Sequence, residues 1–332
     1  MKKLTAILLT LVMILGLAAC AGGSGEVTYA IVCKDASNPY MLKMIEGFGK
    51  ACDAMGIKWL TKSPETTSVD DQINIVNDLV AQGVKGIAIA ANDAAALKAT
   101  IEQARAKGVV IVTLDSDTAG SQMFINQAGV EQVAQVLVDS VADMAGGEGE
   151  FAILSASSTA TNQNAWIDAM KVILAKPDYA GLKLVEIAYG DDEPTKSTTE
   201  TQNLLSKYPN LEVICCPTTV GILAASQTVL NTAGCTVKIA GLGLPSEMKE
   251  YVGDDKVCPY MYLWNPIEVG ECAAYAIEAI LGGADIAVGA KFTAKNNVEY
   301  SVTAGDPAEV QIIVGPPFAF TGENIGTWAE VY

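Results

Sequence analysis

Histidine is absent from the 332-residue sequence, and arginine occurs once, at Arg105. Without histidine the chain has no Ser-His-Asp triad, and it lacks both the commonest general base and the usual ligand of zinc sites. A nucleic-acid groove needs clustered lysines and arginines, which a chain with a net charge of −17 and a single arginine does not supply. The composition therefore argues against a histidine-dependent hydrolase and against nucleic acid as a partner.

Cysteine pairs with metal-binding or redox spacing are missing as well. The chain has eight cysteines, but none of them forms a Cys-x-x-Cys motif. Cys33, Cys215 and Cys216 lie within apolar runs, where a free thiol behaves as a small hydrophobic side chain. We therefore expect buried free thiols rather than disulfides or a metal centre, and we expect no cofactor.

The N-terminus resembles a bacterial lipoprotein signal. Two lysines precede an apolar stretch over residues 4–17, which is shorter than a membrane-spanning helix, and Leu-Ala-Ala-Cys ends it. This pattern predicts a signal peptide over residues 1–19, a lipidated Cys20 and a tether over residues 20–26. A diacylglyceryl group would anchor the protein outside the cytoplasm, at the cell surface or in the periplasm. The alternative is an ordinary signal peptide with an incidental cysteine.

Short β-branched runs alternate with helical patterns from residue 27 onward, which predicts parallel βαβ units. The predicted strands cover residues 27–33, 57–60, 86–90 and 109–114 in the first half and 150–155, 182–189, 212–216 and 236–242 in the second. The chain without its predicted signal peptide is also too long for one typical core. We therefore expect an α/β fold with two doubly wound parallel-sheet lobes.

Polar and aromatic side chains follow the ends of these strands in both halves. In doubly wound sheets, ligands lie beyond the carboxyl ends of the strands, so these side chains are candidate contacts. The candidates are Lys34, Asn38, Tyr40, Asp115, Asp117 and Asn126 in the first half, and Asn162, Gln163, Pro217, Thr219, Trp264 and Asn265 in the second. Each of them alone is an ordinary turn or cap residue. Their occurrence in both halves predicts a cleft shared by two lobes.

The chemistry of these candidates suits a sugar. Asn and Gln amides match hydroxyls, because each amide has two donors and two acceptor lone pairs. Carboxylates and lysine make the stronger, charge-assisted hydrogen bonds. Tyr40, Trp166 or Trp264 can cover an apolar C–H face of a sugar and exclude water, although Trp166 can equally pack inside its own lobe. We therefore expect a monosaccharide ligand.

Seven motifs carry a resemblance to a known family. They are SNPY (37–40), TLDSDT (113–118), INQ (125–127), TATNQNAW (159–166), the TKS…TETQNLL run (195–205), PTTVG (217–221) and YLWNP (262–266). With these motifs in family order, the chain resembles the type I periplasmic binding proteins, which are solute receptors of bacterial ABC transporters. Within that group it is similar to the rhamnose-binding and autoinducer-2-binding lipoproteins.

The resemblance implies ligand contacts and a choice between two ligands. Four positions match the autoinducer-2 receptors, namely Lys34, Asp115, Gln163 and Pro217. Two depart from them, because Asn162 stands where those receptors have aspartate and Thr219 where they have alanine. The loss of a carboxylate at Asn162 suits a neutral deoxyhexose such as rhamnose. Autoinducer-2 is the alternative ligand.

The resemblance also implies the domain organisation and the partners. The N-lobe would comprise residues 27–126 plus 266–290, and the C-lobe residues 127–263 plus 291–332. Crossovers near Asn126, Trp264 and Lys291 would form a three-strand hinge that closes on the ligand. The expected protein is a monomer that passes its sugar to an ABC transporter permease. The alternative is a receptor that signals to a membrane sensor.

Enzymatic activity is the rival interpretation of the cleft. Asp115 and Asp117 could act as a glycosidase pair, but Lys34 nearby would keep one carboxylate ionised. The chain contains Gly-Leu-Gly at residues 241–243 without the third glycine of a dinucleotide-binding fingerprint. We therefore expect a binding protein without catalytic activity.

Overall fold

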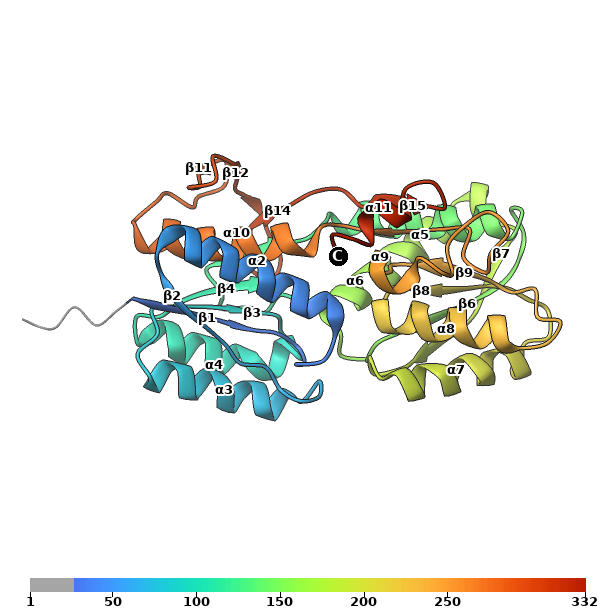
Figure 1. Cartoon of the computed structure of the whole chain (residues 1–332), viewed down its shortest axis with the longest axis horizontal. Coiled ribbons are helices and arrows are strands. Elements are labelled where there is room, and N and C mark those ends of the chain that lie inside the picture. The colour runs from blue at the N-terminus through green and yellow to red at the C-terminus, as the bar shows by residue number, and fades with distance from the viewer. Residues whose placement is uncertain (1–26) are drawn as a thin grey trace, which may run out of the picture.

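The computed structural model describes residues 27–332, which form two α/β lobes side by side (Figure 1). The predicted signal peptide, the tether and Cys20 lie outside the described residues. Among residues 27–332, no helix is both long enough and apolar enough to cross a membrane.

The N-lobe is built on a seven-stranded sheet with the order β13-β14-β5-β4-β3-β1-β2. The strands are β1 (Thr28–Val32), β2 (Lys58–Thr61), β3 (Gly86–Ile89), β4 (Val110–Leu114), β5 (Met123–Asn126), β13 (Thr303–Ala304) and β14 (Val310–Ile313). All neighbouring strands pair in parallel except β13 and β14. Helices α2 (Pro39–Met55) and α10 (Pro266–Leu281) cover one face, and α3 (Val69–Ala81) and α4 (Ala94–Ala106) cover the other (Figure 1).

The C-lobe contains a four-stranded parallel sheet with the order β7-β6-β8-β9. Its strands are β6 (Gly149–Ser155), β7 (Leu182–Tyr189), β8 (Leu211–Cys216) and β9 (Lys238–Gly241), and a separate antiparallel pair joins β10 (Tyr260–Leu263) to β15 (Phe318–Thr321). Its helices are α5 (Val130–Met144), α6 (Thr161–Leu174), α7 (Pro194–Lys207) and α8 (Thr219–Asn231), with the short α9 (Pro245–Met248) and α11 (Ile325–Trp328). The predicted α/β class with parallel sheets in two lobes is therefore confirmed.

Local sequence signals account for several element ends. The Ser68 hydroxyl caps α3 by accepting a hydrogen bond from the backbone N–H of Asp71 at 3.3 Å. Gly56 ends α2 in the left-handed conformation, with φ of 71°. All seven cysteines within residues 27–332 are free thiols, and Cys33, Cys215 and Cys216 are buried as expected.

The C-terminal segment is divided between the lobes, which corrects the expectation that residues 291–332 belong to the C-lobe. Strand β14 pairs in parallel with β5 of the N-lobe sheet, with Ile312 opposite Ile125. The hairpin of β11 (Lys291–Thr293) and β12 (Glu299–Ser301) lies on the same lobe (Figure 1). Only β15 and α11 pack on the C-lobe. The pairing satisfies the backbone groups along the edge of β5, and the apolar pattern of β14 alone does not say which edge it will cover.

Three segments connect the lobes. Residues 127–129 lead from β5 to α5, and residues 264–265 lead from β10 to α10. The third crossover spans residues 314–317 between β14 and β15, rather than the region near Lys291. Lys291 begins the β11–β12 hairpin within the N-lobe, so it is not part of the hinge.

Helices α2 and α10 pack backbone against backbone through two glycines. A Cβ atom on Gly270 would lie 1.9 Å from the carbonyl oxygen of Met44, and a Cβ atom on Gly47 would lie 1.9 Å from the carbonyl oxygen of Ile267. Real Cβ atoms do not approach a backbone oxygen this closely, so any side chain at either position must push the helices apart. The close approach fixes α10, which follows a hinge crossover, against α2.

Substitution of Gly270 by alanine tests this packing. We expect Gly270→Ala to lower the free energy of unfolding by about 1–3 kcal/mol, because it overpacks a helix contact that cannot relax. Gly326→Ala is the matched control, since a Cβ atom there meets nothing within 4 Å. Urea unfolding followed by circular dichroism measures both variants. Equal midpoints for Gly270→Ala and the wild type would contradict the close approach.

Candidate ligand-binding site

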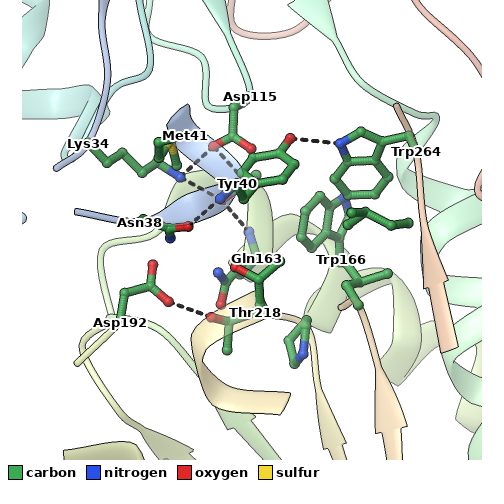
Figure 2. Close-up of a pocket in the computed structure, with 15 residues that line it drawn as sticks. Lys34, Asn38, Tyr40, Met41, Asp115, Gln163, Trp166, Asp192, Thr218 and Trp264 are labelled. Atoms are coloured by element: carbon green, nitrogen blue, oxygen red, sulfur yellow. Dashed lines mark hydrogen bonds and ion pairs between the residues drawn. The ribbon is translucent and has the colours of Figure 1, made fainter. Parts of the chain in front are cut away.

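A cavity lies between the two lobes and brings together most of the predicted site residues. Its fifteen lining residues are Lys34, Asn38, Tyr40, Met41, Asp115, Asn162, Gln163, Trp166, Asp192, Pro217, Thr218, Thr219, Leu242, Leu263 and Trp264 (Figure 2). We call this space the main cavity. Nine of the twelve residues predicted to contact a ligand line it. They come from strand ends and helix starts of both lobes, as the strand-end rule for parallel sheets requires.

An ion pair between Lys34 and Asp115 forms the N-lobe side of the main cavity. Lys34 Nζ lies 2.7 Å from Asp115 Oδ2, and the two side chains are 8% and 4% exposed. Lys34 follows β1 and Asp115 follows β4, two strands on either side of β3. Asp115 has a positive φ of 61°, a conformation that aspartate tolerates better than most residues. Of the two aspartates expected near Lys34, Asp115 is therefore the one that pairs with it.

Asn162 brings the C-lobe into contact with this ion pair. Its Oδ1 lies 3.5 Å from Lys34 Nζ, and its Nδ2 donates to Asp115 Oδ2 at 3.3 Å. Both distances are at the long end of the hydrogen-bond range. Asn162 is at the start of α6, where its Oδ1 also accepts from the backbone N–H of Gln163 at 2.9 Å. The two lobes therefore meet through polar groups that a ligand hydroxyl can also engage.

Two buried amides behind Lys34 hold the end of β1, and neither is among the twelve predicted contacts. Gln72 on α3 is fully buried, and its Nε2 donates to the carbonyl oxygens of Cys33 at 3.1 Å and Ala90 at 2.7 Å. Its Oε1 accepts from the backbone N–H of Asn92 at 2.9 Å. Asn92 Nδ2 in turn donates to the carbonyl oxygen of Lys34 at 2.9 Å. A glutamine on the core-facing side of a predicted helix is the sequence signal that could have revealed this network.

Asp35 and Asn38 shape the entry into α2. Asp35 Oδ1 accepts from the backbone N–H groups of Ser37 at 2.8 Å and Asn38 at 2.7 Å. Asn38 then caps the helix, since its Oδ1 accepts from the backbone N–H of Tyr40 at 2.9 Å. The cap occupies the oxygen of the Asn38 amide and leaves its nitrogen as the group that can donate to a ligand.

Three aromatic side chains form one wall of the main cavity (Figure 2). Trp264 Nε1 donates to the Tyr40 hydroxyl at 2.7 Å, and the Trp166 and Trp264 ring centroids are 5.7 Å apart. Trp166 is 3% exposed, so it both packs in its own lobe and lines the cavity. Burial, followed by the negative charge of Asp115, raises the pKa of Tyr40 well above its usual value, so its hydroxyl stays protonated.

Gln163 uses one end of its amide for the scaffold. Its Oε1 accepts from the Ser155 hydroxyl at 2.6 Å and from the backbone N–H of Ala156 at 2.7 Å, which ties α6 to the end of β6. Its nitrogen is thereby the end that can donate to a ligand. Asn164 does not line the main cavity, because its Nδ2 donates to the carbonyl oxygen of Ser158 at 2.8 Å.

Asp192 and Thr218 also line the main cavity, and the predicted set did not include them. Asp192 follows β7 and accepts a hydrogen bond from the Thr218 hydroxyl (Figure 2). Burial raises the pKa of Asp192, although the Thr218 hydrogen bond and the positive charge of Lys34 oppose the shift. The rule that selects strand ends applies equally to Gly-Asp-Asp after β7, so the same signal identifies Asp192.

Three of the predicted contacts lie outside the main cavity, which corrects their assignment to it. Asp117 is 3% exposed, and its Oδ1 accepts from Thr118 N–H and its Oδ2 from Ala308 N–H, both at 2.8 Å. Asn126 Nδ2 donates to Gln311 Oε1 at 2.9 Å. The Oδ1 atom of Asn265 caps α10 by accepting from Ile267 N–H at 3.0 Å. All three are turn or cap residues that fold their polar groups back onto the backbone or a neighbouring strand.

The geometry of Asp115 and Asp117 does not suit a glycosidase pair. Asp115 is ion-paired with Lys34 in the main cavity, whereas Asp117 accepts four hydrogen bonds from the N-lobe. Paired glycosidase carboxylates must both face the same sugar ring. Asp117 therefore does not form a glycosidase pair with Asp115.

Residues 29–285 match the family model of the periplasmic binding protein domain. The chain belongs to the periplasmic binding protein family. This match covers most of the chain and confirms the predicted family.

Two solved structures and one sequence relative match this chain over nearly their whole length. An ABC transporter solute binding protein from Clostridium phytofermentas with bound L-rhamnose is 44% identical, with a TM-score of 0.89, over 93% of this chain and 100% of that one. The protein LsrB from Clostridium saccharobutylicum, in complex with AI-2, has a TM-score of 0.85 at 22% identity over 91% and 99% of the two chains. The ribose import binding protein RbsB of Bacillus subtilis is 25% identical over 85% of this chain and 94% of its own.

By their names, the rhamnose-bound relative is a transporter solute binding protein and RbsB is an import binding protein, and neither is an enzyme. The family match places this chain among such sugar-binding transport proteins rather than among enzymes. Both predicted branches are represented among them, by the rhamnose-bound and the AI-2-bound structures. The family works outside the cytoplasm, where its members bind a solute between two lobes.

The pH dependence of stability tests the environment of Asp192 in this periplasmic binding protein. We expect Asp192→Asn to stabilise the ligand-free protein at neutral pH, because burial disfavours the ionised carboxylate. A pKa raised in the folded state makes the carboxylate destabilising above that pKa, and the penalty vanishes below the ordinary carboxyl pKa of about 4. The melting temperatures of variant and wild type should therefore differ at pH 7 and converge near pH 3.

Asp191→Asn is the matched control for this comparison. Asp191 is the neighbouring residue, and it forms an ion pair with Lys196 near the surface. Its replacement should leave stability at pH 7 unchanged or slightly lower, since exposed pairs contribute little. A lower melting temperature for Asp192→Asn than for the wild type at pH 7 would show that the hydrogen bond from Thr218 and the charge of Lys34 outweigh the desolvation of this partly buried carboxylate.

Proposed function

We propose that this protein binds a neutral monosaccharide in the main cavity, and that the ligand is a 6-deoxyhexose such as L-rhamnose. The carrying observation is the combination of an ion pair, three amides and an aromatic wall, contributed by both lobes to one cavity. The relative with bound L-rhamnose supports the same ligand class, since it is 44% identical over nearly the whole chain.

The groups in the main cavity match the hydroxyls and the apolar face of such a sugar. Lys34 supplies donors and Asp115 supplies acceptors for hydroxyls that can do both. The Asn38 and Gln163 amides present their nitrogens, because their oxygens are engaged in the scaffold. Trp166, Trp264 and Tyr40 would cover the apolar ring face and the methyl group of a deoxyhexose. The sugar would thus be held by directed hydrogen bonds at one side and by an apolar wall at the other.

Closure of the two lobes would complete the site. Asn162 belongs to the C-lobe and touches Lys34 and Asp115 of the N-lobe only when the lobes are together. A hydroxyl placed between these groups would replace two long hydrogen bonds with shorter ones, which favours the closed state in proportion to its differential affinity. The closed protein would then deliver its sugar to an ABC transporter permease.

The membrane attachment and the second ligand belong to the same proposal. We infer that a lipid on Cys20 anchors the protein outside the cytoplasm, because the sequence that ends in Leu-Ala-Ala-Cys resembles a lipoprotein signal. We also infer that the protein is a monomer. Autoinducer-2 is the second candidate ligand, since Lys34, Asp115, Gln163 and Pro217 match its receptors. A receptor that signals to a membrane sensor would use the same cleft, and only the partner protein distinguishes it from a transporter component.

Titration calorimetry of the purified protein tests the ligand class. We expect heat and a saturable stoichiometry of one with L-rhamnose, weaker binding of other deoxyhexoses and hexoses, and no binding of autoinducer-2. The sugar should be recovered chemically unchanged. No heat with any monosaccharide would refute the proposal, and tight binding of autoinducer-2 would reassign the ligand.

Asn162→Asp tests what selects between the two ligands. The change would place a second carboxylate 3.3 Å from Asp115 and remove the amide donor of Asn162. We expect L-rhamnose affinity to fall by about 1–3 kcal/mol, because a partner is left unpaired in a closed cleft. Autoinducer-2 should bind only when Thr219→Ala is added. Calorimetry with both ligands measures each variant.

Asn164→Asp is the matched control, since Asn164 starts the same helix but does not line the main cavity. It introduces the same charge two residues away and should leave L-rhamnose affinity nearly unchanged. Equal losses in the two variants would mean that the charge acts at long range and that Asn162 does not contact the ligand.

A further inference from the structure

One carboxylate in the main cavity has an oxygen that the protein leaves unused. Asp192 is partly buried, and its Oδ1 accepts a hydrogen bond from the Thr218 hydroxyl. Its Oδ2 makes no hydrogen bond within residues 27–332. In this range the unpartnered side-chain atoms sealed from solvent belong to Gln127 and Ser226, so Asp192 Oδ2 remains accessible. Because a carboxylate has acceptor sites on both oxygens, Asp192 keeps one oxygen for a ligand.

The loop after β7 turns this carboxylate toward the cavity. Asp191 and Asp192 both have a positive φ, of 54° and 53°, a conformation that aspartate tolerates but most residues avoid. The backbone N–H of Gly190 donates to the carbonyl oxygen of Ser155 at 2.9 Å, which ties the loop to the end of β6. The two aspartates then take different directions, since Asp191 pairs with Lys196 near the surface whereas Asp192 lines the main cavity. The loop therefore places Asp192 before a ligand arrives.

Asp192 lies across the main cavity from the aromatic wall. Figure 2 shows it on the opposite side from Trp166 and Trp264. A sugar that lays an apolar face on these rings turns its hydroxyl-bearing side away from them. At least one hydroxyl of such a sugar is thereby directed toward Asp192.

The charge of Asp192 is not matched by a contact with a base. Among the fifteen residues that line the main cavity, Lys34 is the one base, and it is paired with Asp115. Burial raises the pKa of Asp192, the Thr218 hydrogen bond and the charge of Lys34 oppose this rise, and the charges of Asp35 and Asp115 add to it. A hydroxyl donor at Oδ2 would favour the ionised form, to which hydrogen bonds are stronger. A carboxylate that is unfavourable alone and favourable beside a donor suits a binding group rather than a scaffold group.

We propose that Asp192 is a specificity-determining residue of the main cavity, whose Oδ2 accepts a hydrogen bond from one ring hydroxyl of the bound sugar. The proposal rests on the proposed function, because a sugar must occupy the main cavity. Within residues 27–332, the Asp192 side chain makes no hydrogen bond to the N-lobe. A sugar held by Asp192 on one side and by Lys34 and Asp115 on the other therefore adds a bridge between the lobes. Sugars that lack this hydroxyl are rejected, because the carboxylate then stays without a donor.

Calorimetry with L-rhamnose and its four monodeoxy analogues, which lack the hydroxyl at C1, C2, C3 or C4, tests this assignment. We expect Asp192→Ala to weaken L-rhamnose binding by about tenfold or more, since a hydrogen bond to a charged group is lost. Asp192→Asn keeps the shape of the side chain and should weaken binding by a smaller factor, because a neutral oxygen is a weaker acceptor. One analogue should bind the wild type more weakly by a similar factor and lose no further affinity in Asp192→Ala, because the hydroxyl and the carboxylate are two ends of one bond.

Asp191→Ala is the matched control, because it makes the same substitution at the neighbouring residue, which has the same backbone conformation and does not line the main cavity. It should change L-rhamnose affinity by less than about threefold, since an exposed ion pair contributes little. Equal L-rhamnose affinities of Asp192→Ala and the wild type, or equal losses in the two alanine variants, would overturn the assignment and leave the proposed function intact. So would a further loss in Asp192→Ala for every analogue. Absence of L-rhamnose binding by the wild type would overturn the proposed function and the assignment together.

Discussion

The buried ion pair of Lys34 and Asp115 is the interaction on which the cleft depends. Two charges that are almost removed from water are stable only if each keeps its partner, because an isolated buried charge is costly. The pair holds the ends of β1 and β4 together at the cleft. The C-lobe contacts this pair through the side chain of Asn162, which hydrogen-bonds to both charged groups. The chemistry of the cleft follows from this one constraint.

Around the ion pair, the two ends of a single side-chain amide have different roles: the oxygen bonds to the protein and the nitrogen is left for a ligand. The oxygens of Asn38 and Gln163 bond to the backbone at a helix start or a strand end. Their nitrogens are then the ends left to donate to a ligand. Gln72 differs, because all of its hydrogen-bonding groups serve the backbone behind Lys34. A ligand site built in this way is rigid before the ligand arrives, which reduces the entropy lost on binding.

The strand-end rule explains how much of the site could be read from the sequence. Parallel strands place their carboxyl ends on one edge, so Lys34, Asp115, Asn162 and Pro217 could be grouped without coordinates. The rule also selected Asp117 and Asn265, because it cannot tell a side chain that faces the cleft from one that caps the local backbone. Asp117 is two residues from Asp115, yet it turns toward the loop at Ala308. That contact joins residues far apart in the sequence, so the sequence pattern around Asp117 does not predict it.

The sequence by itself determined the alternation of strands and helices, the absence of histidine chemistry, the family and most of the polar residues in the cleft. These follow from local periodicity, composition and motifs, which act over a few residues at a time. Only the tertiary structure decided that β14 extends the N-lobe sheet and that residues 314–317 form the third crossover. It alone decided that the Gln127 side-chain oxygen has no hydrogen-bond partner among residues 27–332. The physical reason is that edge pairing and side-chain orientation depend on groups brought together from distant parts of the chain.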